Sequence, residues 1–147
     1  MKIAFACDHA GFDYKERVIA FIKSLGHEVI DFGCNGPESV DYPDYAEPAA
    51  RAVAEGKADR GVLICGTGIG VSMVANKVKG IRCALVHDHL TAELTRLHND
   101  ANMISFGARI IGIEVAFDCI KTFLTTEFLG DRHSRRVEKM MAIEKKP

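Results

Sequence analysis

A chain of 147 residues, with 48% hydrophobic and 27% charged residues, has the size and composition of one ordinary globular domain with a single core. Its net charge of -1 excludes an electrostatic case for binding nucleic acid or an anionic membrane, so we expect a small molecule or another protein as partner. The five cysteines form an odd set without a C-x-x-C pair, which indicates neither a disulfide framework nor a zinc ribbon and favours a reducing cytoplasm. A strand pattern begins at Lys2, so we expect no cleavable signal, and the longest uncharged stretch, 61–76, is too short and too rich in glycine to cross a bilayer.

Short apolar runs alternate with segments of helical periodicity along the chain. The runs predict strands at 3–6, 28–32, 61–65, 83–86 and 103–106, and the intervening segments predict helices near 13–25, 45–55, 71–77, 90–98 and 112–126, followed by a charged helix from about 132. Repeated strand–helix units with short connections predict a five-stranded parallel sheet between two helical layers, a Rossmann-like three-layer α/β/α sandwich. Because no linker, repeat or low-complexity tract interrupts the pattern, we expect residues 1–147 to form a single domain.

The third predicted strand ends in a cysteine, Cys65, and a glycine-rich segment leads from it into the next helix. That segment consists of Gly66, Thr67, Gly68, Ile69 and Gly70. Backbone N–H groups of small residues at a helix start can converge on negative charge, so the pattern predicts an anion pocket beside a thiol that ionises easily. The alternative is a buried core cysteine followed by an ordinary glycine turn. A dinucleotide site is disfavoured, because Val71 stands where the G-x-G-x-x-G pattern needs glycine or alanine.

Polar residues also follow other predicted strands, and ligands of such sheets bind beyond the carboxyl ends of the strands. Candidates for one shared rim are Asp8, His9, Cys65, Thr67, His87 and Asp88, together with His98 at the end of a helix. Taken singly, Asp8 could cap the first helix, Thr67 could satisfy loop backbone and His98 could interact with its helix dipole. A metal site built from Asp8, His9, His87 and His89 is a further alternative, but without H-E-x-x-H or a cysteine cluster we expect no metal.

Two arginines near the C-terminus, Arg132 and Arg136, are spaced i, i+4. If Asp131 caps a helix there, both guanidinium groups lie on one helical face and can present paired donors to a phosphate. The alternative is a solvated basic face balanced by Glu138. The spacing therefore allows a phosphorylated ligand without requiring one.

Several of these motifs together resemble the B type of ribose-5-phosphate isomerases. They are Asp8-His9-Ala10-Gly11 after the first strand, Asp41-Tyr42-Pro43, the segment 64–70, His98-Asn99, Gly107-Ala108-Arg109 and the pair Arg132 and Arg136. The resemblance covers almost the whole chain, and the motifs occur in the family's order. The wider family also includes galactose-6-phosphate and allose-6-phosphate isomerases, so the resemblance indicates a reaction more securely than a sugar.

The resemblance implies a cofactor-free isomerase that interconverts D-ribose 5-phosphate and D-ribulose 5-phosphate through a cis-enediolate, in the non-oxidative branch of the pentose phosphate pathway. Cys65 matches the family's base, Thr67 would relay or steady the proton, and His98 matches the residue that opens the sugar ring. By the same resemblance Asp8 and Asn99 orient sugar oxygens, the backbone of 66–70 holds the enediolate, and the phosphate is held by His9, Arg109, Arg132 and Arg136. Family members with a different base carry Glu at the position of Val71, so this chain resembles the cysteine branch.

The resemblance also implies a homodimer, or a tetramer, with active sites between subunits and the C-terminal helix from about 131 at the interface. The apolar stripe of that helix, Val137, Met140, Met141 and Ile143, also fits packing on its own domain. Two rival functions remain open at this point. One is a sugar-phosphate or nucleotide binding module without catalysis, and the other is a metal-dependent hydrolase.

Overall fold

Five strands form the centre of the computed structural model, which describes residues 1–147. They are β1 (Lys2–Cys7), β2 (Glu28–Asp31), β3 (Arg60–Cys65), β4 (Cys83–Leu85) and β5 (Met103–Gly107), in the spatial order β2-β1-β3-β5-β4. All neighbouring strands pair in parallel, which confirms the predicted five-stranded parallel sheet. The three central strands are almost wholly buried, as expected for apolar runs covered on both faces.

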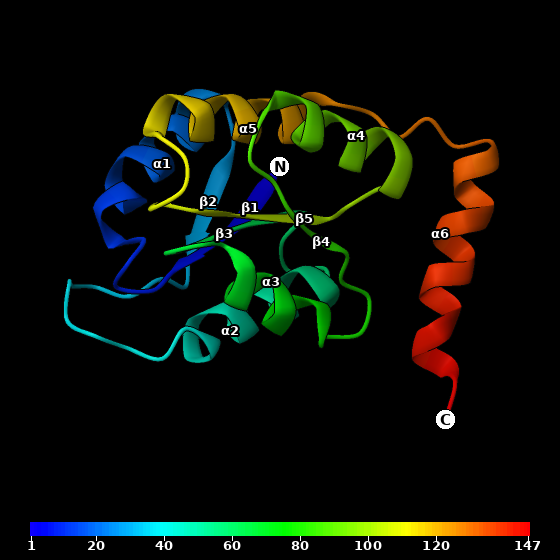
Figure 1. Ribbon diagram of the computed structural model, residues 1–147, viewed down its shortest axis with the longest axis horizontal. Coiled ribbons are helices and arrows are strands. Elements are labelled where there is room, and N and C mark those ends of the chain that lie inside the picture. Colours follow the sequence, from blue (N-terminus) through cyan, green and yellow to red (C-terminus); the bar gives the residue numbers. More distant parts are fainter.

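Helices cover both faces of the sheet (Figure 1). One layer contains α1 (Phe12–Ser24), α4 (His89–Asn99) and α5 (Ile113–Thr125), and the other contains α2 (Pro43–Ala54) and α3 (Ile69–Asn76). Alternate residues of β1 point into the two layers: Ile3 and Phe5 join the core with α1 and α5, whereas Ala4 and Ala6 join the core with α2. The second core is rich in alanine, and small side chains let α2 lie close against the sheet. The predicted three-layer sandwich is therefore confirmed.

The carboxyl ends of the three central strands lie side by side. Cys7 pairs with Ile64, and Cys65 pairs with Gly107, so the loops that follow β1, β3 and β5 emerge at one edge of the sheet. The loops approach closely, because a Cβ added to Gly107 would lie 2.5 Å from the Cα of Thr67. Only glycine fits at this position. We call this edge the carboxyl edge.

The opposite, amino edge is where the strands begin. Helix α4 starts just after β4 and runs back to this edge, since its last residue, Asn99, is followed within a few residues by the start of β5. Helix α6 (Arg132–Ala142), which ends in the short 3-10 helix η1 (Ile143–Lys145), stands beside the C-terminal end of α4 at the right of Figure 1. Only one residue of α6 is buried, so this helix packs lightly on its own domain.

The predicted helices and strands are all present, and their observed ends lie within about two residues of the predicted ones. The main difference is α3, which begins at Ile69 because Gly68 takes a left-handed φ of 78° that turns the chain from strand into helix. None of the helices combines the length and the apolar character that crossing a membrane requires.

Candidate active site

Cys65 ends β3 at the carboxyl edge and is 5% exposed. The N–H of Gly68 donates a hydrogen bond to its Sγ at 3.1 Å, and α3 begins one residue later. Any negative charge that develops on this sulfur therefore meets a backbone donor and the positive end of a helix. This arrangement favours the reactive interpretation of Cys65 over an inert core thiol.

The loop after Cys65 presents free backbone donors. The N–H groups of Gly66, Thr67 and Gly70 have no hydrogen-bond partner within the chain. The loop itself is rigid, because the Ser105 hydroxyl donates to the Gly68 carbonyl at 2.8 Å and the Ile69 N–H donates to the Thr67 Oγ1 at 3.2 Å. The Thr67 hydroxyl thus satisfies loop backbone, as the structural alternative expected, while its own proton stays free. A fixed loop with unpaired donors fits a developing oxyanion.

Asp8 lies directly beside this loop. Its N–H donates to the Ile64 carbonyl at 3.2 Å, and its buried carboxylate accepts through Oδ1 from Ala10 and Gly11. Both donors precede α1, which begins at Phe12, so the expectation that Asp8 caps the helix is wrong and the carboxylate instead closes the preceding turn. The other oxygen, Oδ2, has no partner within the chain and is free to accept from a ligand.

His9 is held in one tautomer. Its Nδ1 accepts from the N–H of Val40 at 3.1 Å, so Nε2 carries the ring proton and can donate it to an anion. Arg109 reaches the same edge: its N–H donates to the Gly66 carbonyl at 3.0 Å, and a Cβ added to Gly66 would lie 3.1 Å from its Nη1. The structure therefore brings these two candidate phosphate-binding side chains, both hydrogen-bond donors, to the carboxyl edge.

Tyr42 is a site residue that sequence reasoning missed. Its ring lies against Gly70, where an added Cβ would come within 2.7 Å of the ring carbon Cζ. The ring is 40% exposed and lies over the glycine loop, where it can contact a ligand bound there. The only sequence signal was its place in the Asp41-Tyr42-Pro43 pattern, where Pro43 begins α2.

His98 and Asn99 do not lie at this edge. They end α4 at the amino edge, so the expectation that His98 shares a rim with Cys65 is wrong for a single chain. The reason is topological, because a helix between parallel strands returns the chain to the edge where strands begin. The Asn99 side chain is exposed and makes no hydrogen bond, and His98 stacks on His133 of α6 with ring centroids 4.3 Å apart.

The arginines of α6 also lie at the amino edge, on the same side of the sheet as His98. Arg132 and Arg136 are exposed and lie one turn apart, as predicted from their spacing. Asp131 precedes the helix, but its side chain makes no capping hydrogen bond, so the predicted cap is absent. His133 is 6% exposed and its Nε2 has no partner; burial lowers its pKa, and so do His98 and the two arginines.

The segment that leads from β4 into α4 contains His87, Asp88 and His89. Asp88 caps α4 by accepting from the Thr91 N–H at 2.8 Å, and this contact lowers the pKa of Asp88. His89 pairs through Nδ1 with Asp118 at 3.0 Å. The structure contains no group of three His, Cys, Asp or Glu side chains placed to hold one metal ion. The ligand set proposed for a metal is therefore not assembled. His87 and Asp88 follow β4, whose carboxyl end lies at the carboxyl edge, so their place in the rim stays a prediction.

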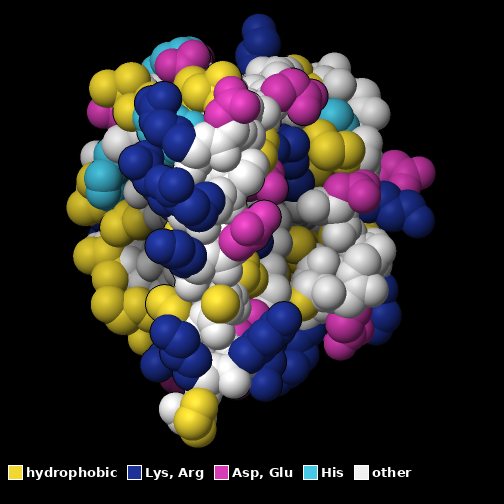
Figure 2. Space-filling model, turned by 90° about the vertical axis from the view of Figure 1, so that its right-hand side faces the viewer, with side chains coloured by type: hydrophobic (Ala, Val, Ile, Leu, Met, Phe, Trp, Pro, Cys, Tyr) yellow, Lys and Arg dark blue, Asp and Glu magenta, His cyan; other side chains and the backbone are white.

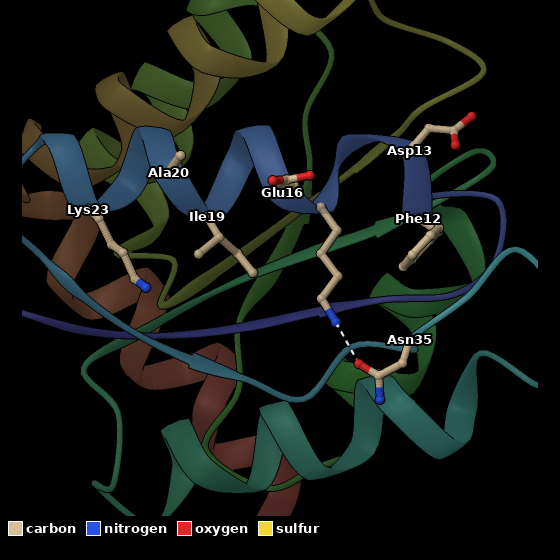
Figure 3. Close-up of a pocket in the computed structure, with 8 residues that line it drawn as sticks. Phe12, Asp13, Glu16, Ile19, Ala20, Lys23 and Asn35 are labelled. Carbon is tan, nitrogen blue, oxygen red and sulfur yellow. Dashed lines mark hydrogen bonds between the residues drawn. The ribbon is translucent and has the colours of Figure 1, made fainter.

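A separate groove of about 680 Å³ lies along α1 (Figure 3). Lys15 crosses it, donating to Asn35 at 3.2 Å and pairing with Asp31 at 2.8 Å. Its lining includes none of the candidate residues. The groove therefore stands apart from the site.

The fold and the carboxyl edge together define a class: a doubly wound α/β protein that presents a buried thiol, a carboxylate and a loop of free N–H donors to a small anionic ligand. The family comparison gives the particular member of that class. The ribose/galactose isomerase family matches residues 3–140, and the chain belongs to this family.

Individual relatives agree over their full length. The chain is 46% identical to ribose-5-phosphate isomerase B of Escherichia coli, over 99% of this chain and 97% of that protein. Its structure resembles that of ribose-5-phosphate isomerase B from Clostridium thermocellum, with a TM-score of 0.96 and 49% identity over 99% of this chain and 98% of the other. It also resembles the Mycoplasma genitalium enzyme with bound ribulose-5-phosphate, with a TM-score of 0.95 and 38% identity over 99% and 97% of the two chains.

Proposed function

We propose that this protein interconverts D-ribose 5-phosphate and D-ribulose 5-phosphate, as the names of its relatives indicate for them. The observation that carries the proposal is the buried Sγ of Cys65 beside unpaired N–H donors, since an aldose–ketose isomerase needs one base and one oxyanion cradle. The reaction belongs to the non-oxidative branch of the pentose phosphate pathway. The five free cysteines fit a reducing, cytoplasmic location.

The chemistry follows from these groups. Cys65, as thiolate, takes the proton from C2 of the open-chain aldose, and the electron pair of that C–H bond forms the C1=C2 double bond of a cis-enediolate. The charge then rests on O1, where the free N–H groups of Gly66, Thr67 and Gly70 stabilise it by about 2.7–4 kcal/mol for each essential donor. Transfer of a proton from O2 to O1 through Thr67, followed by return of a proton from sulfur to C1, completes the ketose. Asp8 Oδ2 orients a sugar hydroxyl during these steps.

A second copy of the chain completes the site in this proposal. One chain carries Cys65 at its carboxyl edge and the candidates His98, Asn99, Arg132 and Arg136 at its amino edge. A two-fold dimer that sets the amino edge of one copy against the carboxyl edge of the other creates two complete sites. His98 of one copy then opens the furanose ring, and its arginines join His9 and Arg109 of the other copy around the phosphate.

The surface of α6 supports this assembly. Lys and Arg side chains gather in a stripe on the face of the molecule that α6 occupies (Figure 2). Along the same segment Met140 is 41% exposed and Ile143 is 61% exposed, whereas Val137 and Met141 are half-buried, so the domain itself leaves part of the apolar stripe uncovered. A basic and apolar face of this kind suits both a partner subunit and a phosphate held between subunits.

Replacing Cys65 by alanine tests the base. We expect conversion of ribose 5-phosphate to fall by at least a thousandfold, because the proton acceptor is lost while the cradle remains. Cys119→Ala, which removes a thiol buried in α5 far from the site, is the matched control and should retain turnover. Near wild-type conversion by the Cys65 variant would refute the assignment. A side-by-side assay on allose and galactose 6-phosphates measures the sugar preference.

Mixing two impaired variants tests the shared site. A heterodimer of Cys65→Ala and His98→Asn subunits holds one site with both residues intact, so unfolding and refolding an equimolar mixture should restore about a quarter of wild-type activity. Each variant refolded alone is the control and should keep its own low residual rate, well below a quarter of wild type. Absence of any recovery, with the dimer verified by sedimentation, would rule out sites shared in this way.

A further inference from the structure

The last turn of α4, which carries His98 and Asn99, is clamped by a side chain from another element. Arg82 lies just before β4, and its Nε donates to the carbonyls of Asn99 and Asp100, both at 3.1 Å. Its Nη2 donates to the same Asp100 carbonyl at 2.7 Å. Carbonyls at a helix C-terminus have no partner within the helix, so Arg82 supplies the donors that this end lacks.

The backbone of Arg82 is fixed in turn by Asn102, which follows the turn after α4. The Asn102 side chain accepts from the Arg82 N–H at 2.8 Å and donates to the Gly80 carbonyl at 2.8 Å. These two bonds tie the residues before β4 to the residues before β5. The backbone that carries Arg82 therefore cannot shift independently of the segment after α4 that its guanidinium contacts.

The turn after α4 is held in an uncommon conformation. Asp100 has a φ of 46°, in the left-handed region where glycine usually ends a helix. Its carboxylate pairs with Arg96 at 2.8 Å and with Arg82 at 3.5 Å, and Arg96 also donates to the Ala101 carbonyl at 2.7 Å. A left-handed backbone costs about 1–2 kcal/mol for a residue with a side chain. The contacts of Asp100 with Arg96 and Arg82 offset this cost and hold the turn in its conformation.

We propose that Arg82 is a positioning residue of the isomerase: through the carbonyls of Asn99 and Asp100 it sets the direction in which the last turn of α4 presents His98 to the sugar. The inference rests on the proposed function, in which His98 opens the ring. Arg82 makes no hydrogen bond or ion pair with the thiol loop or with the arginines of α6, and its side-chain hydrogen bonds all go to Asn99 and Asp100 at the end of α4. We therefore expect its removal to leave Cys65 and the donors of the glycine loop in place.

The chemistry of the two substrates separates this role from a general loss of structure. Ribose 5-phosphate is a furanose whose C1–O4 bond must break, with a proton leaving the O1 hydroxyl and another reaching O4. Ribulose 5-phosphate stays open, because O5, the oxygen that would close its five-membered ring, carries the phosphate. Exchange of the C1 proton of ribulose 5-phosphate therefore needs the Cys65 half of the reaction and no ring opening.

A double-mutant cycle with Arg82→Ala and His98→Asn tests the proposal. In the wild-type background Arg82→Ala should lower kcat/KM for ribose 5-phosphate about 10- to 100-fold, the cost expected of a misplaced group. In the His98→Asn background the same change should cost less than about threefold, because both act through one residue. Equal losses in the two backgrounds, or wild-type activity of Arg82→Ala, would overturn the proposal.

Further variants guard against simple loss of folding. Arg82→Lys keeps the charge and one donor and should recover part of the activity, while Asp100→Asn keeps a side chain that tolerates the left-handed turn and should lower kcat/KM less than Arg82→Ala. Arg51→Ala removes an exposed arginine paired with Glu47 on α2 and should leave kcat/KM unchanged. Deuterium exchange into C1 of ribulose 5-phosphate should stay within about threefold of wild type for Arg82→Ala. Parallel loss of exchange and conversion would overturn the proposal, whereas a wild-type protein inactive on both sugars would refute the proposed function instead.

Discussion

Substitution of Gly68 would disturb the geometry of the thiol loop directly, and substitution of Gly56 provides the control. Both have a left-handed backbone, with φ of 78° and 75°. A Cβ at Gly56 would meet nothing within 4 Å, whereas at Gly68 it would lie 2.7 Å from the Leu85 Cδ1 and from the backbone of Phe106. Alanine at the two positions therefore differs in crowding and not in backbone strain.

The expected destabilisation follows from these two terms. Alanine in a left-handed conformation costs about 1–2 kcal/mol at either position. Gly68→Ala adds an overpacking cost of about 1–3 kcal/mol, because the atoms that it meets include backbone, which cannot rotate away. We expect Gly56→Ala to lower the free energy of unfolding by about 1–2 kcal/mol and Gly68→Ala by about 2–5 kcal/mol. For a chain of this size each kcal/mol lowers Tm by about 2–4 °C.

Urea unfolding followed by circular dichroism, at one protomer concentration, measures both values. Activity gives a second comparison, because the Gly68 N–H contacts the Cys65 Sγ and its displacement removes a donor from the thiol. Gly68→Ala should lose about a hundredfold in kcat, whereas Gly56→Ala should retain wild-type turnover. Equal destabilisation by the two substitutions, or full activity of Gly68→Ala, would refute the steric argument.

The remaining predictions concern the phosphate, pH and the core. Arg132→Ala combined with Arg136→Ala should raise KM for phosphorylated sugars by at least about a hundredfold, since each charged hydrogen bond is worth about 1.5–3 kcal/mol. The double variant should spare any turnover of free ribose, and Arg135→Ala is the control. Equal losses on both sugars would remove the phosphate role. Burial lowers the pKa of His133, so below about pH 6.5 the unfolded chain binds the proton more readily and stability falls on acidification. His133→Phe should flatten the urea-unfolding free energy between pH 7 and about pH 5, and an unchanged slope would contradict this. Phe5→Ala should cost about 3–5 kcal/mol in the same assay, because Phe5 is fully buried, and a loss below about 1 kcal/mol would mean that the core collapses around the cavity.

Residues immediately after strands were predictable from the sequence. Cys65 ends an apolar run bounded by glycine, and Asp8 follows the first such run, so the rule that parallel strands share a carboxyl edge places both in one site. The bonds of Asp8 and Cys65 then follow from short-range geometry within a few residues. Local pattern and tertiary structure agree here because burial of the apolar runs fixes how the strands pair. The residues that follow the strands are thereby placed side by side.

Residues at helix ends were predicted less well. His98 was grouped with Cys65, although a helix that precedes a strand must end near that strand's beginning. Tyr42 was marked only by its place in the Asp41-Tyr42-Pro43 pattern, and Arg82 carried no local signal. Their roles depend on contacts with Gly70 and with the carbonyls of α4. Such contacts join segments that lie far apart in the chain, and the helix and strand periodicity of the sequence does not indicate them.

The sequence by itself determined the α/β class, the order of the elements and the motifs by which the chain resembles its family, because these depend on local patterns of apolar and small residues. Only the tertiary structure decided that the candidate residues form two groups at opposite edges of the sheet. The physical reason is that each connection reverses the chain across the full length of a strand, so Cys65 and His98 are separated by the sheet that supports them both.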